Sequence, residues 1–152
     1  MKVILTVPCE PAGGPAGCLP LVPLLDRPFL QHVVEVLAGR DLTDVHFVLG
    51  RHADAVERFL GTGARWGGTF HYHLTPDPDR PAGALAAAGA AGPVLLGKLD
   101  RLPLLPDPLP AGRTLFEAGG AWTGWAVADA ADVAALPPSL PWVALEALLA
   151  GQ

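Results

Sequence analysis

The chain has 152 residues, with 10 lysine plus arginine residues against 15 aspartate plus glutamate residues, and its net charge is −5. This acidic balance argues against proteins that bind nucleic acid or an anionic membrane surface, because both functions need clustered cations. Hydrophobic residues make up 51% of the chain and charged residues 16%, which is enough apolar material for a single domain over residues 1–152.

The apolar runs, the first residues and the cysteine spacing indicate where the protein is located and what its thiols do. Proline and glycine interrupt every long apolar run, so no stretch is expected to span a membrane. The first residues lack the long apolar core and small-residue cleavage site of a secretory signal, and we expect a cytoplasmic protein. Cys9 and Cys18 lack the four-ligand spacing of a zinc site, so they are expected to be free or buried thiols.

Strands and helices are predicted to alternate along the chain. The expected order is strand 3–7, Gly/Pro loop 8–20, helix 28–37, strand 45–49, helix 53–60, strand 69–74, turn 75–81, helix 82–89, strand 93–96, proline-rich connection 101–112, strand 121–128 and helices 129–136 and 141–149. This alternation predicts an α/β fold, a three-layer sandwich with a mostly parallel central sheet. The continuous apolar run of the first strand places that strand inside the sheet.

The third predicted strand carries two histidines on one face. His71 and His73 alternate with Phe70 and Tyr72, so each pair shares a side of the strand. Two histidines on one face could bind a metal ion. The sequence offers no apparent third ligand, and we expect a solvent-facing pair on an edge strand.

One known family is similar to this chain over most of its length. Arg80-Pro81-Ala82-Gly83-Ala84-Leu85 resembles the Gly-Thr-Ala-Gly-Ala-Leu turn of the sugar-1-phosphate nucleotidylyltransferases. "VIL…LPLVPLLDRPFLQHV" is similar to the family's "VILAGG…PKPLLPV…RPLLEH", and "VLLGKLDRL" to its strand that ends in Gly-Asp. The resemblance implies a nucleotide-diphospho-sugar transferase-like fold. It implies vestigial nucleotide-binding positions at Thr6, Gly83 and Ala84, and a magnesium ligand at Asp100.

The first loop departs from the family pattern. The family has Gly-Gly-x-Gly-x-Arg, whereas this chain continues as Thr6-Val7-Pro8 and has Cys18 where the arginine would fall. The family's loop lysine falls near Leu19 or Leu21. Removing one group that stabilises developing charge commonly costs about 2.7–4 kcal/mol of transition-state stabilisation. We therefore expect a degenerate, non-catalytic protein that needs no cofactor and binds a protein partner or subunit.

Two other functions stay open. A minimal active nucleotidyltransferase would form an NDP-sugar from an NTP and a sugar-1-phosphate, using Mg²⁺ at Asp100. Its cations would come from Arg27, Arg80, Lys98 and Arg101. Alternatively, the chain could be a sensor that binds a nucleotide or a sugar phosphate without turnover.

An apolar patch is the expected interface for self-association or for a larger partner. It combines Leu104 and Leu105 of the proline-rich connection with Trp122 and Trp125. The alternative is that this connection folds back onto the core of its own chain.

Overall fold

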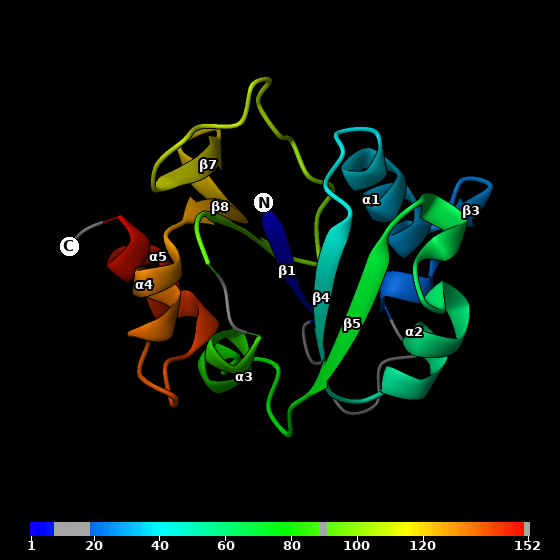
Figure 1. Cartoon of the computed structure of the whole chain (residues 1–152), viewed down its shortest axis with the longest axis horizontal. Coiled ribbons are helices and arrows are strands. Elements are labelled where there is room, and N and C mark those ends of the chain that lie inside the picture. The colour runs from blue at the N-terminus through cyan, green and yellow to red at the C-terminus, as the bar shows by residue number, and fades with distance from the viewer. Residues whose placement is uncertain (8–18, 89–90, 151–152) are drawn as a thin grey trace.

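The structure is a computed structural model that describes residues 1–7, 19–88 and 91–150 (Figure 1). Its strands are β1 (Lys2–Thr6), β2 (Pro23–Leu24), β3 (Arg27–Pro28), β4 (Asp44–Leu49), β5 (Thr69–Leu74), β6 (Val94–Lys98), β7 (Thr114–Ala118) and β8 (Ala121–Ala128). Its α-helices are α1 (Phe29–Ala38), α2 (Ala53–Leu60), α3 (Ala82–Ala87), α4 (Ala130–Ala134) and α5 (Trp142–Leu149). Short 3-10 turns occupy Leu19–Leu21 and Ala64–Trp66.

Six of these strands form one mixed sheet in the order β5-β4-β1-β6-β8-β7. The four strands from β5 to β6 are parallel, and β8 and β7 pair antiparallel. Figure 1 shows β1 in the middle of the sheet. Val3, Ile4 and Leu5 of β1 are each fully buried, which confirms the prediction of an internal first strand.

Helices cover both faces of the sheet, as predicted. On one face, α1 and α2 pack against side chains such as Val3, Leu5 and Phe47. On the other face, α3, α4 and α5 pack against the alternate residues, including Ile4 and Val48. The period of two along each strand therefore divides its side chains between two separate cores.

The predicted elements match the structure except at some boundaries and at three short strands. The sequence pattern missed β7, a short strand at the edge of the sheet, and the small pair β2–β3. Most of the predicted loop 8–20 lies outside the described residues, as does residue 89 of the predicted helix 82–89. Within the described ranges, no helix has both the length and the apolar character needed to cross a bilayer.

The proline-rich connection after β6 is attached to the sheet face that α1 covers. The guanidinium group of Arg40 donates hydrogen bonds to the carbonyl oxygens of Leu105 (2.8 Å) and Pro106 (2.6 Å). The Leu105 side chain is 8% exposed and belongs to the same core as Val3 and Leu5. The connection is thus part of the domain.

Close packing of Trp125 on Gly97 joins the parallel and antiparallel parts of the sheet. The two residues are cross-strand partners on β8 and β6, and Trp125 is fully buried. A Cβ atom added to Gly97 would lie 2.5–2.7 Å from three carbon atoms of the Trp125 ring. Only glycine leaves room for the indole at this position.

Gly97→Ala is expected to lower the free energy of unfolding by about 1–3 kcal/mol, because the buried indole and the sheet must both shift to admit a methyl group. Gly83→Ala is the matched control, since a Cβ atom at Gly83 has no neighbour within 4 Å. This control is expected to be neutral or to stabilise by up to about 1 kcal/mol, because alanine favours a helix. Urea unfolding measures both changes, and equal stability of the two variants would contradict the packing described here.

Candidate functional site

The arrangement of the sheet identifies one edge as the expected ligand-binding edge. From β1 the chain first builds outward through β4 and β5, and then returns to the other side of β1 with β6. Ligands of open α/β sheets bind outside the carboxyl ends of the strands where the direction of building reverses. Here this place lies beyond Thr6 and Lys98, which are register partners at the ends of β1 and β6. The backbone N–H of Leu99 donates to the Thr6 carbonyl oxygen at 2.9 Å and holds the two ends together.

Asp100, the predicted magnesium ligand, lies directly beyond the end of β6. Its side chain is 29% exposed, and its Oδ2 atom is 3.3 Å from Nζ of Lys98. Gly124 of β8 adjoins this pair: a Cβ atom there would be 3.2 Å from Lys98 Cβ and 3.9 Å from Asp100 Oδ1. The carboxylate therefore faces the reversal point, and an ammonium group already neutralises its charge.

Two small clefts open on either side of Asp100. One, of about 150 Å³, is lined by Lys98, Asp100, Arg101, Trp122, Thr123, Gly124, Trp142 and Glu146. The other, of about 160 Å³, is lined by Val22, Pro23, Leu24, Phe29 and Asp100. The first, called the polar cleft, is the more polar of the two and has an aromatic wall, and the second is mainly apolar. Together they offer a charged centre flanked by surfaces of different character.

Ring stacking and one hydrogen bond hold the aromatic wall of the polar cleft. The Trp122 and Trp142 rings stack with centroids 5.6 Å apart and planes 12° apart. The Trp122 indole N–H donates to the carbonyl oxygen of Trp125 at 2.9 Å, so it is anchored to the buried centre of β8. A flat ring held in this way can support a sugar or a base by stacking.

Carboxylates neutralise three of the four cations that the sequence offered to an active site. Arg27 lies 3.0 Å from Asp26 and 2.7 Å from Glu35. The hydrogen bond from Arg27 lowers the pKa of Asp26 below its usual value. The remaining cations are Lys98, paired with Asp100; Arg80, 3.6 Å from Asp77; and Arg101, which is exposed and has no ion pair among the described residues.

Gly83 and Ala84, the nucleotide-binding positions that the resemblance implies, lie in the first turn of α3. Gly83 is exposed and Ala84 is half-buried. Because a Cβ atom at Gly83 would meet nothing within 4 Å, packing does not require glycine there. The open backbone at Gly83 leaves room for a ligand to approach, which is the role that the family resemblance implies for this position.

The predicted interface patch divides into buried and accessible residues. Leu104 is 68% exposed, and Trp122 is half-buried against α5. Leu105 is 8% exposed and Trp125 is fully buried, so the expectation of an exposed patch is wrong for these two residues. Leu105 is covered because Arg40 fixes its backbone to the domain, and Trp125 because Gly97 makes room beneath it.

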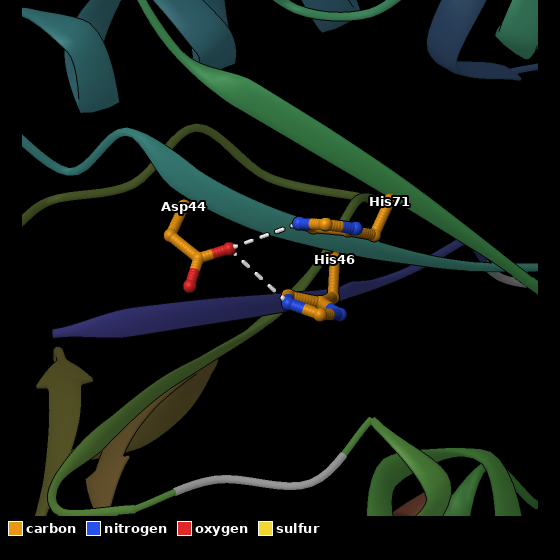
Figure 2. A group of neighbouring side chains, drawn as sticks. All are labelled: Asp44, His46 and His71. Atoms are coloured by element: carbon orange, nitrogen blue, oxygen red, sulfur yellow. Dashed lines mark ion pairs between the residues drawn. The ribbon is translucent and has the colours of Figure 1, made fainter.

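A second cluster consists of Asp44, His46 and His71 in the amino-terminal halves of β4 and β5. It lies toward the opposite ends of the parallel strands from Asp100. Asp44 Oδ1 is 3.2 Å from His46 Nε2 and 3.4 Å from His71 Nε2, and Figure 2 shows both rings turned toward the carboxylate. His46 Nδ1 lies 2.8 Å from His73 Nε2. Burial, followed by the charge of Lys2, lowers the pKa of His46 to about 4.

Sequence reasoning found His71 and His73 but missed their partners on β4. The pair lies on an edge strand, as expected. The expectation of no further ligand is wrong for His71, because Asp44 and His46 form with it a set of three potential metal ligands that does not include His73. The pairing of His46 with His71 follows from the parallel register of β4 and β5. The signal was the alternation shared by "DVHFVL" and "TFHYHL", which aligns the histidines once the strands are known to be neighbours.

Solved structures with the same architecture identify the fold. A Bacillus anthracis protein described as a glucose-1-phosphate thymidylyltransferase, in complex with a sucrose, superposes with a TM-score of 0.73 over 99% of this chain and 82% of its own, at 16% identity. HddC from Yersinia pseudotuberculosis gives a TM-score of 0.70 over 93% of this chain and 82% of its own, at 14% identity. The chain has a nucleotidyltransferase fold.

Sequence relatives point to the same group of proteins. A glucose-1-phosphate thymidylyltransferase from Xanthomonas campestris is 29% identical over 101 residues, which is 66% of this chain and 31% of that protein. The bifunctional protein GlmU from Sinorhizobium fredii is 46% identical over 44 residues, which is 29% of this chain and 10% of that protein. The matched part thus spans about a third or less of these relatives. No family model matches the chain.

Exchanging the two neighbouring leucines for aspartate is expected to separate surface from core. Leu105→Asp should lower the free energy of unfolding by at least about 2 kcal/mol, because it loses the burial of a leucine and places a charge in the core. Leu104→Asp should change stability by no more than about 0.5 kcal/mol, because that side chain is already in water. Chemical denaturation of both variants tests this, and a marked loss in Leu104→Asp would contradict its surface position.

Proposed function

We propose that this protein is a nucleotidylyltransferase-like protein that does not catalyse nucleotidyl transfer and acts by binding. The observation that carries the proposal is the Lys98–Asp100 ion pair at 3.3 Å, at the point where the fold would hold a metal ion and a phosphate. Phosphoryl-type transfer depends on cations that are available to neutralise charge developing on the phosphates. In this cleft, the nearest cation and the nearest carboxylate neutralise each other.

The other acidic groups near this end of the chain strengthen the proposal. Mg²⁺ is normally held by one or two carboxylates together with substrate phosphates. Asp129 and Asp132 follow β8, whose last residue, Ala128, pairs with Val94 at the start of β6, so they lie at the opposite end of β6 from Asp100. Asp132 is also 3.6 Å from Arg113 in an ion pair. Glu146 lines the same cleft as Asp100 and is the other carboxylate there, but a magnesium ion would still have to displace Lys98 from Asp100. We therefore expect no cofactor.

The proposed binding partner is a second copy of the chain or a larger protein subunit. Its docking surface would be the segment around Leu102 and Leu104, which are 41% and 68% exposed. Pro103 and Pro106 stiffen this segment, so ordering it on contact costs little conformational entropy. Leu105 and Trp125 form no part of this proposed surface.

A second candidate function is binding of a sugar phosphate or nucleotide without turnover. The specific observation in its favour is the polar cleft of about 150 Å³, where Lys98 and Arg101 adjoin the stacked Trp122 and Trp142. The B. anthracis structure contains a sucrose, and HddC has also been solved with GMP-PN, at a TM-score of 0.65 to this chain. Drug-sized ligands usually occupy about 300–1,000 Å³, so the cleft suits one moiety of such a ligand.

Mixing the protein with nucleoside triphosphates, sugar-1-phosphates and Mg²⁺ is expected to release no pyrophosphate above the rate of a protein-free blank. The reason is the neutralised Lys98–Asp100 pair together with the loss of the family's loop cations. Asp100→Ala is the matched control, because it removes the candidate metal ligand. Pyrophosphate release that disappears in Asp100→Ala would establish the minimal active enzyme and overturn the proposal. Calorimetry with Mg²⁺ alone should show no tight site.

Self-association is expected to depend on Leu104. Light scattering at micromolar concentration should show a species larger than the monomer, and Leu104→Asp should shift it toward the monomer. Leu74→Asp is the matched control, because Leu74 is 74% exposed but lies on β5. If the native protein is monomeric and Leu104→Asp binds cellular proteins as the native chain does, the proposed docking surface is wrong.

A further inference from the structure

We propose that Asp44, His46 and His71 form a binding site for a zinc ion at the amino ends of β4 and β5. The inference does not depend on the proposed function, because the site lies at the opposite edge of the sheet from Asp100. Two imidazoles and one carboxylate are a donor set that zinc accepts, with water in the fourth position. Figure 2 shows the two imidazole rings, from neighbouring strands, turned toward the Asp44 carboxylate.

The distances between the donor atoms suit a tetrahedral ion. Zinc–ligand bonds of about 2.0–2.1 Å place the ligand atoms of a regular tetrahedron about 3.3 Å apart. Asp44 Oδ1 is 3.2 Å from His46 Nε2 and 3.4 Å from His71 Nε2, so two of the three edges already have this length. All three donor atoms lie within 4.8 Å of one another. The His46 and His71 rings stack with centroids 4.3 Å apart and planes 20° apart, so the exposed His71 ring has to tilt for both nitrogen atoms to point at one ion.

Unsatisfied buried atoms provide an independent reason to place a cation here. The His46 side chain is 8% exposed, and its Nε2 atom is buried without a hydrogen-bond partner. The Oδ1 atom of Asp44 is also buried and without a hydrogen-bond partner, although Nε2 is in contact with it. Buried polar atoms in folded proteins are almost always paired. A cation held between the two atoms would satisfy both.

A neighbouring histidine can orient the His46 ring as metal binding requires. A metal-bound imidazole usually donates its other ring N–H to an acceptor, which orients the ring. His46 Nδ1 is 2.8 Å from His73 Nε2, so His46 can donate there and turn the lone pair of Nε2 toward Asp44.

The surroundings decide which ion is accepted. Magnesium prefers oxygen ligands and octahedral geometry, so a site with two imidazoles selects a transition metal such as zinc. Lys2 is a nearby positive charge that would repel a metal ion, and its Nζ donates to the Ala88 carbonyl oxygen at 2.9 Å. The Asp44 and His71 side chains are 50% and 45% exposed, which gives an ion a path from solvent and leaves a position for water.

The experiment measures Zn²⁺ affinity by competition with a chromophoric chelator, using the full chain with Cys9→Ser and Cys18→Ser so that thiols do not contribute. One zinc ion per chain is expected. His71→Ala and Asp44→Asn should each weaken binding by at least about tenfold, the loss that even indirect partners of metal ligands produce. His32→Ala is the matched control, because it removes an exposed histidine of α1 outside the cluster and should leave the affinity unchanged.

Two further measurements use the same proteins. Bound Co²⁺ should give the intense visible absorption of a four-coordinate ion, and Mg²⁺ should not compete with zinc. Zinc should raise the midpoint of thermal unfolding of the parent protein, and should raise it by less in the two ligand variants at the same zinc concentration. Absence of stoichiometric zinc binding would overturn the proposal. So would equal zinc affinity in the parent, His71→Ala and Asp44→Asn, which would mean adventitious binding to surface groups.

Discussion

The packing of the Trp125 indole on Gly97 is the constraint on which the rest of the molecule depends. It fixes the register between β6 and β8, and therefore joins the four parallel strands to the antiparallel pair. Because β6 also pairs with β1, the same contact sets where β6 ends and where Asp100 stands. The carbonyl oxygen of Trp125 holds Trp122, so one wall of the cleft is attached to the same point. A slip of one residue would turn Trp125 to the other face and dismantle all of this.

Much of the fold could be predicted from the sequence because most elements contain enough residues to show the hydrophobic repeat of a strand or a helix. The run at 3–5 and the helical spacing at 29–37 each predict an element without knowledge of its neighbours. The strand β7 could not be predicted in this way. It has five residues, lies at the edge, and pairs with β8 through an irregular register between Leu115 and Glu117. Pairing with β8 decides which residues of β7 are buried, so the sequence of β7 alone shows no clear strand pattern.

The candidate sites show the same limit more sharply. Asp100 was found because a motif places it at a strand end, whereas its neutralisation by Lys98 depends on side-chain geometry. Leu105 and Trp125 were misplaced because one is covered through Arg40 and the other through Gly97, and both residues are distant in sequence or on another strand. His46 was missed because its relation to His71 exists only in the register of two parallel strands. These sites depend on contacts between elements, and the sequence predicts the elements better than it predicts those contacts.

The attachment of the proline-rich connection by Arg40 has a consequence for how that segment responds to its surroundings. Pro103, Pro106, Pro108 and Pro110 have no N–H group, so the segment is held through carbonyl oxygens that accept from one guanidinium group. Arginine keeps its charge at every pH that folded proteins tolerate. The segment is therefore held by a residue type that stays charged, whereas burial lowers the pKa of His46 in the cluster on β4 and β5 to about 4. The attachment of the proline-rich connection and the histidine cluster thus depend on charge in different ways.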